Sequence, residues 1–195
     1  MQLPSIPLVV LDTETTGFTP KVNRVIEYAS VRVVDGQVVD EYEQLISIPG
    51  EIPAVVSALT RIEDSALEGK PTFEEVRADI IAHMGEDTLI VGQNVGFDIR
   101  MLKGEEIDLS DRPWIDTSML ASLVFPELES YSLGYVSKAL DLNHEPVHRA
   151  LGDVNATLEL LSRCWERLLE LSPELRVPLD TIMERAPEGY QRLFG

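Results

Sequence analysis

Apolar residues in the first quarter of the chain follow the short runs and alternations that are typical of β-strands. Leu8–Leu11 is an apolar run of the kind found in a buried central strand. Two runs rich in β-branched residues, Val25–Val34 and Val38–Ile48, are separated by Asp35-Gly36, a dipeptide that favours a tight hairpin. The chain is therefore predicted to begin with three antiparallel strands.

Beyond Pro49 the spacing of apolar residues becomes helical, with two short strands between the helices. Thr72 and Glu75 have the spacing of a capping box, which predicts a helix from Thr72 to Met84. Short apolar runs at 89–91 and 114–115 predict the two strands. The other predicted helices span 53–59, 95–103, 117–124, 132–140 and 150–171. Three strands followed by alternating strands and helices predict an α/β fold with a mixed sheet flanked by helices.

The last helix is the longest and carries one apolar stripe, because its apolar residues repeat at alternating intervals of three and four. Cys164 lies beside the stripe and is predicted to be a small buried hydrophobe. The stripe consists of Leu151, Val154, Leu158, Leu161, Trp165 and Leu168. We expect a domain over residues 1–172 and an extension over 173–195 that packs on it or binds a partner.

Composition indicates an ordinary globular protein. A chain of 195 residues, 44% of them hydrophobic, suits one domain with a substantial core. No apolar run approaches the roughly 20 residues that span a bilayer, and the N-terminus lacks the pattern of a signal peptide. The single cysteine excludes an internal disulfide, and no Cys/His zinc spacing occurs. A cytoplasmic protein with no membrane contact is expected.

The charge balance changes this picture, because 16 Lys+Arg against 34 Asp+Glu give a net charge of −18. Proteins that hold nucleic acid by neutralising many phosphates are usually basic, so composition alone argues against such a partner. Acids that bind divalent cations, however, reverse the local potential. An enzyme that holds only the last few nucleotides also needs few phosphate contacts.

Two carboxylates, Asp12 and Glu14, end the first predicted strand. Being two residues apart, they point to the same face of that strand. Such a pair repels and loses hydration unless a cation joins it, and Mg²⁺ or Mn²⁺ prefers these oxygen ligands. A strand end that has reached solvent would explain the pair equally well.

The run Asp12-Thr13-Glu14-Thr15 also resembles the Asp-x-Asp-x-Thr start of haloacid-dehalogenase-like phosphatases. Glu replaces the second Asp of that motif. A hairpin directly after the first strand does not suit that family's parallel sheet, so a phosphatase is the less favoured interpretation.

Two further places carry candidate chemistry. Asp98 falls in the first turn of a predicted helix, where the helix dipole favours an acid, and Asn94 is a candidate cap. His148 and Asp153 would lie on different faces of a continuous helix, but they converge if His148 lies in the loop after Pro146. A histidine in such a loop is a natural general base.

Three other candidates are set aside. His83 and His144 are predicted to be surface or packing residues. Asp116, which precedes Thr117, is predicted to end a strand and cap a helix rather than to bind a metal.

These elements, in this order, resemble the histidine subtype of the DEDD exonucleases, which share a ribonuclease-H-like fold. The resemblance covers about residues 8–170. The run 12–17 (Asp-Thr-Glu-Thr-Thr-Gly) matches the first motif, Phe97-Asp98 ends the second, and His148 with Asp153 matches the third. Segments 24–27 and 59–62 further resemble the proofreading epsilon subunits of bacterial DNA polymerases and their stand-alone relatives.

The chain departs from this pattern at two positions. Gln93 stands where such relatives often have His, and Arg61 stands where Gly is common. Both departures concern substrate fit rather than the metal carboxylates.

The resemblance implies a two-metal-dependent 3′–5′ exonuclease that releases nucleoside 5′-monophosphates from single-stranded DNA or RNA ends, in proofreading or end trimming. Two Mg²⁺ or Mn²⁺ ions would be held by four acids, with Asp12 bridging them, and His148 would take the proton of the attacking water. The metal ligands implied are Asp12, Glu14, Asp98 and Asp153. The substrate contacts implied are Thr15, Thr16, Leu59, Phe97 and Asn94. For Phe97, plain core packing is an equally good explanation.

A second function class is an adaptor within a polymerase or another assembly. An adaptor has no physical need for a costly carboxylate cluster, which argues for the enzyme. An acidic surface suits a tethered subunit, which argues for the adaptor. A proofreading subunit would combine the two functions. The expected partners are a nucleic acid 3′ end and a polymerase. The run Tyr190–Phe194 resembles peptides that bind bacterial sliding clamps, although a Leu-Phe pair also packs on its own domain. The choice of DNA or RNA and the oligomeric state are left open.

Overall fold

A mixed five-stranded sheet forms the centre of residues 1–170, the part of the chain that the computed structural model describes. The strands lie in the order β3-β2-β1-β4-β5. Neighbours among β1, β2 and β3 pair antiparallel, whereas β4 runs parallel to β1 and β5 parallel to β4. The strands are β1 (Leu8–Thr15), β2 (Val25–Val34), β3 (Gln37–Leu45), β4 (Leu89–Gly92) and β5 (Trp114–Asp116). The predicted mixed sheet is confirmed.

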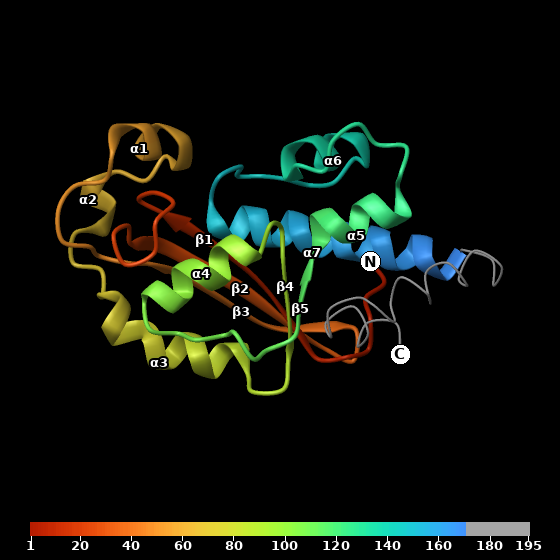
Figure 1. Cartoon of the computed structure of the whole chain (residues 1–195), viewed down its shortest axis with the longest axis horizontal. Coiled ribbons are helices and arrows are strands. Elements are labelled where there is room, and N and C mark those ends of the chain that lie inside the picture. The colour runs from red at the N-terminus through yellow and green to blue at the C-terminus, as the bar shows by residue number, and fades with distance from the viewer. Residues whose placement is uncertain (171–195) are drawn as a thin grey trace.

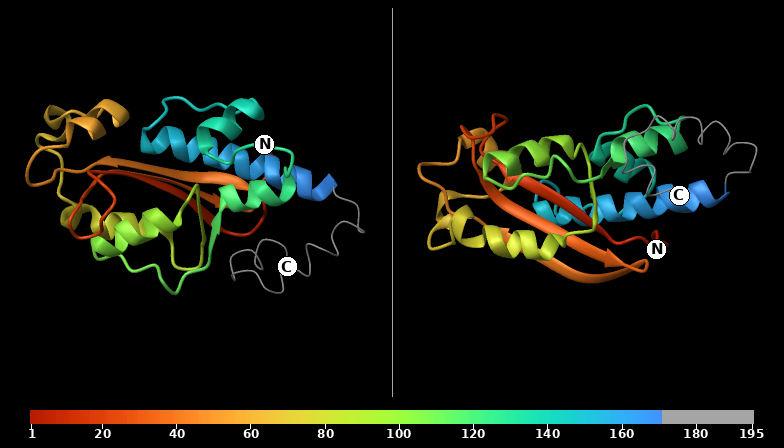
Figure 2. Two further views of the ribbon diagram at one scale, coloured as in Figure 1. Left: turned by 45° about the horizontal axis from the view of Figure 1, so that its top comes forward. Right: turned by 60° about the horizontal axis from the view of Figure 1, so that its bottom comes forward.

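Helices cover both faces of this sheet. The left view of Figure 2 shows α7 on one side and α3 and α4 on the other, and Figure 1 shows α7 running along the sheet. Each predicted helix is present in residues 1–170, and α2 is an addition. The helices are α1 (Ala54–Thr60), α2 (Asp64–Leu67), α3 (Phe73–Met84), α4 (Gly96–Gly104), α5 (Thr117–Val124), α6 (Leu133–Ala139) and α7 (Ala150–Glu170). None of the helices in this part of the chain is both long and apolar enough to cross a membrane.

The alternation of side chains along β1 divides the core into two layers. Leu8 and Val10 pack in a cluster with α5 and α7, whereas Val9 and Leu11 pack in a cluster with α3 and α4. All four side chains are almost fully buried. Apolar residues on both faces are typical of a central strand covered by helices on both sides. The carboxylates that follow at positions 12 and 14 are therefore carried on a rigid element.

Two local predictions are confirmed, and the end of one strand differs from its prediction. Asp35 and Gly36 both have positive φ, 52° and 72°, as a tight hairpin turn of the predicted kind requires. Thr72 and Glu75 form the predicted capping box at the start of α3. The third strand, however, ends at Leu45 rather than Ile48, because Ser47 donates its backbone N–H to the carbonyl of Pro71 and leaves β2.

The predicted apolar stripe of α7 packs on the core at all six positions, four of them buried and two partly buried. Leu151 and Trp165 are only partly buried, whereas Val154, Leu158, Leu161 and Leu168 are buried. The buried surface is broader than one stripe, because α7 packs on β1 and β2 and also on α5 and α6. Cys164 is buried within it, as predicted.

The predicted domain end at residue 172, the extension 173–195 and the clamp-like run Tyr190–Phe194 lie outside the described residues or at their border. They stay predictions.

The capping box predicts a measurable contribution to stability. Thr72→Ala removes the side-chain oxygen that accepts from the backbone N–H of Glu75, and the expected loss in the free energy of unfolding is about 1 kcal/mol. Thr72→Ser, which keeps that oxygen, should retain most of this stability. Urea denaturation of the three proteins measures the difference. An equal loss in both variants would assign the effect to the methyl group of Thr72 instead.

Candidate active site

Two carboxylates continue the α7-facing side of β1 beyond its apolar residues. Asp12 and Glu14 follow Leu8 and Val10 at intervals of two, so all four lie on one face of the strand. The carboxylates are partly buried, in contrast to the fully buried apolar positions. The predicted pair therefore lies on one face, and that face is covered by α7.

A buried ion pair holds the start of α7 against this strand end. Glu27 on β2 is directly opposite Glu14 and is fully buried. Its carboxylate accepts from Arg149, with Nη2 at 2.6 Å from Oε1, and from the backbone N–H of Ala150 at 2.9 Å. Ala150 is the first residue of α7, so Glu27 satisfies one of the backbone donors that a helix leaves free at its N-terminus.

The third predicted element converges at the same place. His148 lies outside α7 with φ 57°, whereas Asp153 lies in its first turn. The backbone N–H of His148 donates to Asp153 Oδ1 at 3.3 Å. One potential ligand atom from each of Glu14, His148 and Asp153 lies within 4.8 Å of the others. The structure thus brings these three residues together, as the sequence predicts.

Asp98 approaches the strand end from the opposite layer. It lies in the first turn of α4 and is buried, with 3% of its surface exposed. Its Oδ1 accepts from the hydroxyl of Thr13 at 2.6 Å and from the backbone N–H of Thr13 at 3.0 Å. Thr13 points away from α7 because it alternates with its neighbours Asp12 and Glu14. Both layers therefore supply a carboxylate to one strand end.

The carboxylates raise one another's pKa values. Burial first, and then the charges of Asp98, Asp153 and Glu14, raise the pKa of Asp12 well above its ordinary value. Burial and the neighbouring Asp153 and Glu27 raise the pKa of Glu14 to about 8. Burial also raises the pKa of Asp98 to about 7, although its hydrogen bonds from Thr13 act in the opposite direction. Holding these groups ionised together is costly in the absence of a counter-charge.

Divalent cations fit this set of donors. The groups that converge are carboxylate oxygens with one imidazole, and hard cations such as Mg²⁺ and Mn²⁺ prefer oxygen ligands. Such a cation would also offset the repulsion that raises the pKa values of Asp12 and Glu14. Asp12, Glu14, Asp98 and Asp153 as the metal ligands nevertheless stay a prediction.

The turn after β1 engages the hydroxyls of its two threonines internally. Thr15 donates to the carbonyl of Gly17 at 2.7 Å, and the hydroxyl of Thr16 accepts from the backbone N–H of Arg24 at 3.0 Å. A substrate contact through the main chain of this turn remains open to both residues, whereas their hydroxyls shape the turn.

The remaining predicted substrate contacts differ in exposure and in what they pack against. Leu59, on α1, is half exposed. Phe97 packs partly on the core, and its ring also lies edge-on to the exposed ring of Phe18, with centroids 6.0 Å apart. Asn94 is exposed, but its predicted capping role is wrong: α4 is capped by Val95 without a side-chain hydrogen bond, because Asn94 turns the chain with φ 56°.

Of the three candidates set aside, two behave as predicted. Asp116 caps α5 by accepting from the backbone N–H of Ser118 at 2.9 Å. His83 is buried, and its Nδ1 lies 2.8 Å from the hydroxyl of Ser30. The prediction for His144 was wrong, because its Nε2 lies 2.6 Å from Oδ1 of Asp153, inside the site.

The sequence analysis thus placed none of Glu27, His144 and Phe18 in the candidate site. Glu27 carried a signal, since an acid within a run of apolar strand residues must find a buried partner. His144 carried none, because its contact depends on the path of the loop before α7.

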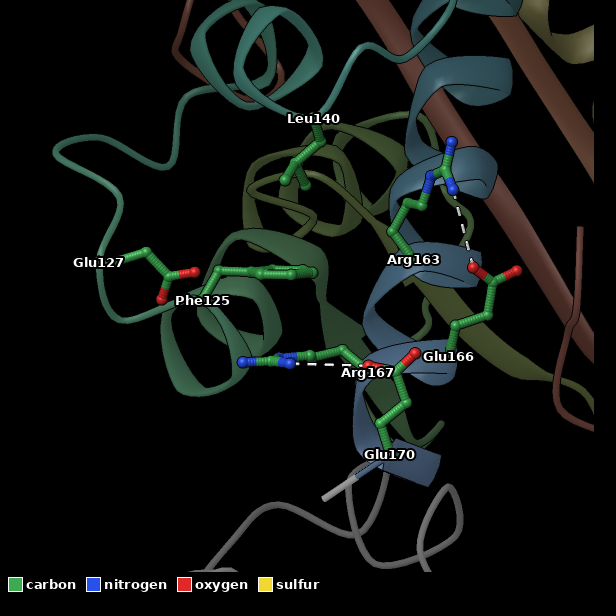
Figure 3. A pocket seen from close by; sticks show the side chains of 7 residues that line it. All are labelled: Phe125, Glu127, Leu140, Arg163, Glu166, Arg167 and Glu170. Carbon is green, nitrogen blue, oxygen red and sulfur yellow. Dashed lines mark ion pairs between the residues drawn. The ribbon is translucent and has the colours of Figure 1, made fainter.

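A pocket at the other end of α7 contains none of the predicted site residues (Figure 3). Two arginines of α7 line it, and both pair with acids of the same helix: Arg163 with Glu159 and Glu166, and Arg167 with Glu170. Phe125 and Leu140 form its apolar part. Both of its arginines are already paired, and its lining carries three glutamates, so the carboxylate cluster is the better candidate for chemistry.

Comparisons with known proteins agree with this geometry. The model of a family described as "Exonuclease" matches residues 9–161. A PolC-type DNA polymerase III of Thermotoga maritima is 39% identical over 167 residues, which are 84% of this chain and 12% of that protein. The 3′-5′ exonuclease DinG of Bacillus subtilis is 33% identical over 168 residues, which are 84% of this chain and 18% of that protein. The chain thus spans less than a fifth of these curated relatives.

Solved structures give the same picture. Exonuclease X in complex with 5′ overhanging duplex DNA is 30% identical, with a TM-score of 0.67 over 82% of this chain and 91% of that chain. Exonuclease I of E. coli in complex with a dA16 oligonucleotide shares the fold, with a TM-score of 0.75 over 91% of this chain and 44% of that chain at 22% identity.

The close contact of α7 with the loop before it predicts a strong effect of Gly152→Ala. A β-carbon at Gly152 would overlap the backbone carbonyl of Pro146, so the loop that carries His148 must shift. We expect a loss of about 1–3 kcal/mol in the free energy of unfolding. Gly134→Ala on α6, where a β-carbon meets nothing within 4 Å, is the matched control and should be neutral or stabilising. Equal melting temperatures for the two variants would contradict the contact.

The carboxylate cluster predicts how stability depends on pH in the presence of a chelator. Glu14 has a pKa of about 8 in the folded protein and an ordinary value of 4.5, so the folded state binds the proton more tightly. The stabilisation that this tighter proton binding gives to the folded state is fully present below pH 4.5 and is lost as pH rises to about 8. The melting temperature should fall over this range, and it should fall less in Glu14→Gln.

The control for that measurement is Glu86→Gln, which removes one charge from an exposed position before β4. In this variant the melting temperature should fall with pH as steeply as it does in the unmodified protein. If the melting temperature of Glu14→Gln fell equally steeply, overall charge rather than the cluster would set the pH dependence of stability.

Proposed function

This chain belongs to the exonuclease family whose model it matches, and we propose that it is a metal-dependent 3′–5′ exonuclease that releases nucleoside 5′-monophosphates from single-stranded ends. The observation that carries the proposal is the convergence of Glu14, His148 and Asp153 beside Asp12 and Asp98. A strand end, a loop and two helix starts supply these residues. Such a cluster has no structural purpose of its own, because it is costly without a cation.

Four carboxylates would hold the metal ions, which we propose to be two Mg²⁺ or Mn²⁺. The charges of Asp98, Asp153 and Glu14 all raise the pKa of Asp12, so the ions that these carboxylates would hold would also be held by Asp12. When bound, two such ions stabilise the attacking and the leaving oxygen of an in-line displacement at phosphorus.

His148 would take the proton of the attacking water. Its backbone N–H is tied to Asp153, so the residue is held at the cluster while its side chain stays exposed. A general base must reach the water and still exchange its proton with solvent afterwards, and an exposed loop histidine satisfies both requirements. The bond that breaks links phosphorus to the 3′ oxygen of the preceding nucleotide.

Aromatic and apolar side chains at the border of the site would receive the terminal base. Phe18 is 88% exposed and rests against Phe97, while Leu59 is 51% exposed. Stacking on such side chains is tolerant of sequence and suits a trimming enzyme. We propose main-chain contacts from Thr15, Thr16 and Asn94 to the last nucleotide, since the threonine hydroxyls are engaged within the turn.

The substrate is proposed to be DNA, and the setting a replicative one. The support is the similarity to PolC-type DNA polymerases and to exonuclease X in its complex with DNA. A polymerase partner, proofreading and a cytoplasmic location are parts of the same proposal. An adaptor without activity is the second candidate, and the net charge of −18 favours it, because an acidic chain holds free nucleic acid weakly.

Digestion of matched single-stranded DNA and RNA oligonucleotides, labelled at the 5′ end, tests the proposal. With Mg²⁺ or Mn²⁺ we expect products that shorten stepwise from the 3′ end, and with a chelator we expect none. His148→Ala should lower kcat by about 10²–10⁴-fold, and Asp12→Ala should abolish cleavage. Glu86→Gln, far from the cluster in sequence, should cleave normally.

Each outcome decides between the candidates. Cleavage of DNA but not RNA supports the replicative setting, whereas cleavage of RNA alone replaces it with RNA end trimming. Folded protein that cleaves neither substrate with either metal would refute the free-standing nuclease and leave the adaptor.

A further inference from the structure

His144 contacts the proposed site from a position that the sequence motifs do not mark. It lies in the loop between α6 and α7, nine residues before Asp153. Its Nε2 is 2.6 Å from Oδ1 of Asp153, and the side chains are only 9% and 14% exposed. A hydrogen bond this short and this sheltered from water is well placed to orient a carboxylate.

Both hydrogen bonds to Asp153 end on the same oxygen. Oδ1 lies 2.6 Å from His144 Nε2 and accepts from the backbone N–H of His148, whereas Oδ2 has no hydrogen bond within residues 1–170. Two donors on one carboxylate oxygen fix the plane of the group and leave the other oxygen available. This is the arrangement that a metal ligand requires, because the ligand oxygen must be presented without competing donors.

The loop does not depend on His144 for its attachment to α7. The backbone N–H of Asn143 donates to Glu159 at 2.9 Å, and Arg149 is held by Glu27 at the other end. His144 lies between these two anchors. Packing alone therefore gives no reason for a polar ring to be directed at Asp153.

We propose that His144 is a positioning residue that donates its Nε2 hydrogen to Oδ1 of Asp153 and so orients this carboxylate toward a divalent cation. The inference rests on the proposed function, in which Asp153 is a metal ligand. In this role the imidazole carries a hydrogen on Nε2, and it does not touch substrate or exchange a proton with it. Its contribution is to metal affinity, and through metal affinity to activity.

Titration calorimetry of the full-length protein with Mn²⁺, without substrate, tests this role apart from catalysis. Loss of a residue that orients a metal ligand typically weakens metal binding about 10–100-fold, which is the effect expected of His144→Ala. Cleavage by this variant should be impaired at low Mn²⁺ and should recover at high Mn²⁺. His144→Gln keeps an N–H donor of similar reach and should regain a large part of the affinity.

The matched control is Glu159→Ala, which releases the loop at Asn143 without touching Asp153. It should lower the melting temperature of the metal-free protein and leave Mn²⁺ affinity unchanged. His144→Ala should show the reverse pattern, with a small change in metal-free melting and a large change in affinity. This opposition separates positioning from plain structural support.

The outcomes also distinguish this inference from the function on which it rests. If the unmodified protein binds Mn²⁺ and cleaves, but His144→Ala binds Mn²⁺ as tightly, only the role of His144 is overturned. If the unmodified protein binds no Mn²⁺ and cleaves nothing, the proposed function fails and takes this inference with it. Should His144→Ala fail to fold, His144→Gln decides, because retention of affinity supports the hydrogen bond and loss of affinity refutes it.

Discussion

The candidate site depends on one buried carboxylate, Glu27. It joins β2 to the first residue of α7 through Arg149 and the backbone of Ala150, and it lies directly opposite Glu14. A buried ion pair is a poor source of net stability, because its desolvation offsets most of the attraction. Its value here is geometric: it sets where α7 begins, and the start of α7 carries His148 and Asp153 to the end of β1.

The rest of the fold supports a strand end that is unfavourable in itself. Burial and mutual repulsion raise the pKa values of Asp12, Glu14 and Asp98, so the cluster opposes folding in the absence of cations. The apolar residues that precede it on β1 are almost fully buried on both faces of the sheet. The same strand thus gives its first half to the core and its last residues to the candidate site.

Features set by a few neighbouring residues could be predicted from the sequence. The Asp35-Gly36 turn, the Thr72 capping box and the shared face of Asp12 and Glu14 depend on local conformation or on the two-residue period of a strand. The width of the buried face of α7 could not be predicted from the sequence, because it depends on packing against β1, β2, α5 and α6 together. Loop conformation, set by individual φ values, decides the contact of His144 with Asp153 and the turn at Asn94. The spacing of apolar residues carries no information about these φ values.

The acidity of the chain is consistent with a nuclease once its basic residues are located. Within residues 1–170, six of them pair with acids of the same chain. These are Arg24, Arg77, Lys103, Arg149, Arg163 and Arg167. Under the proposed function, the local positive charge comes from cations at the cluster, and the terminal base is held by apolar surface. Under the same proposal, such a site would bind an end rather than a length of strand, and a partner that delivers the end would supply what the surface charge does not.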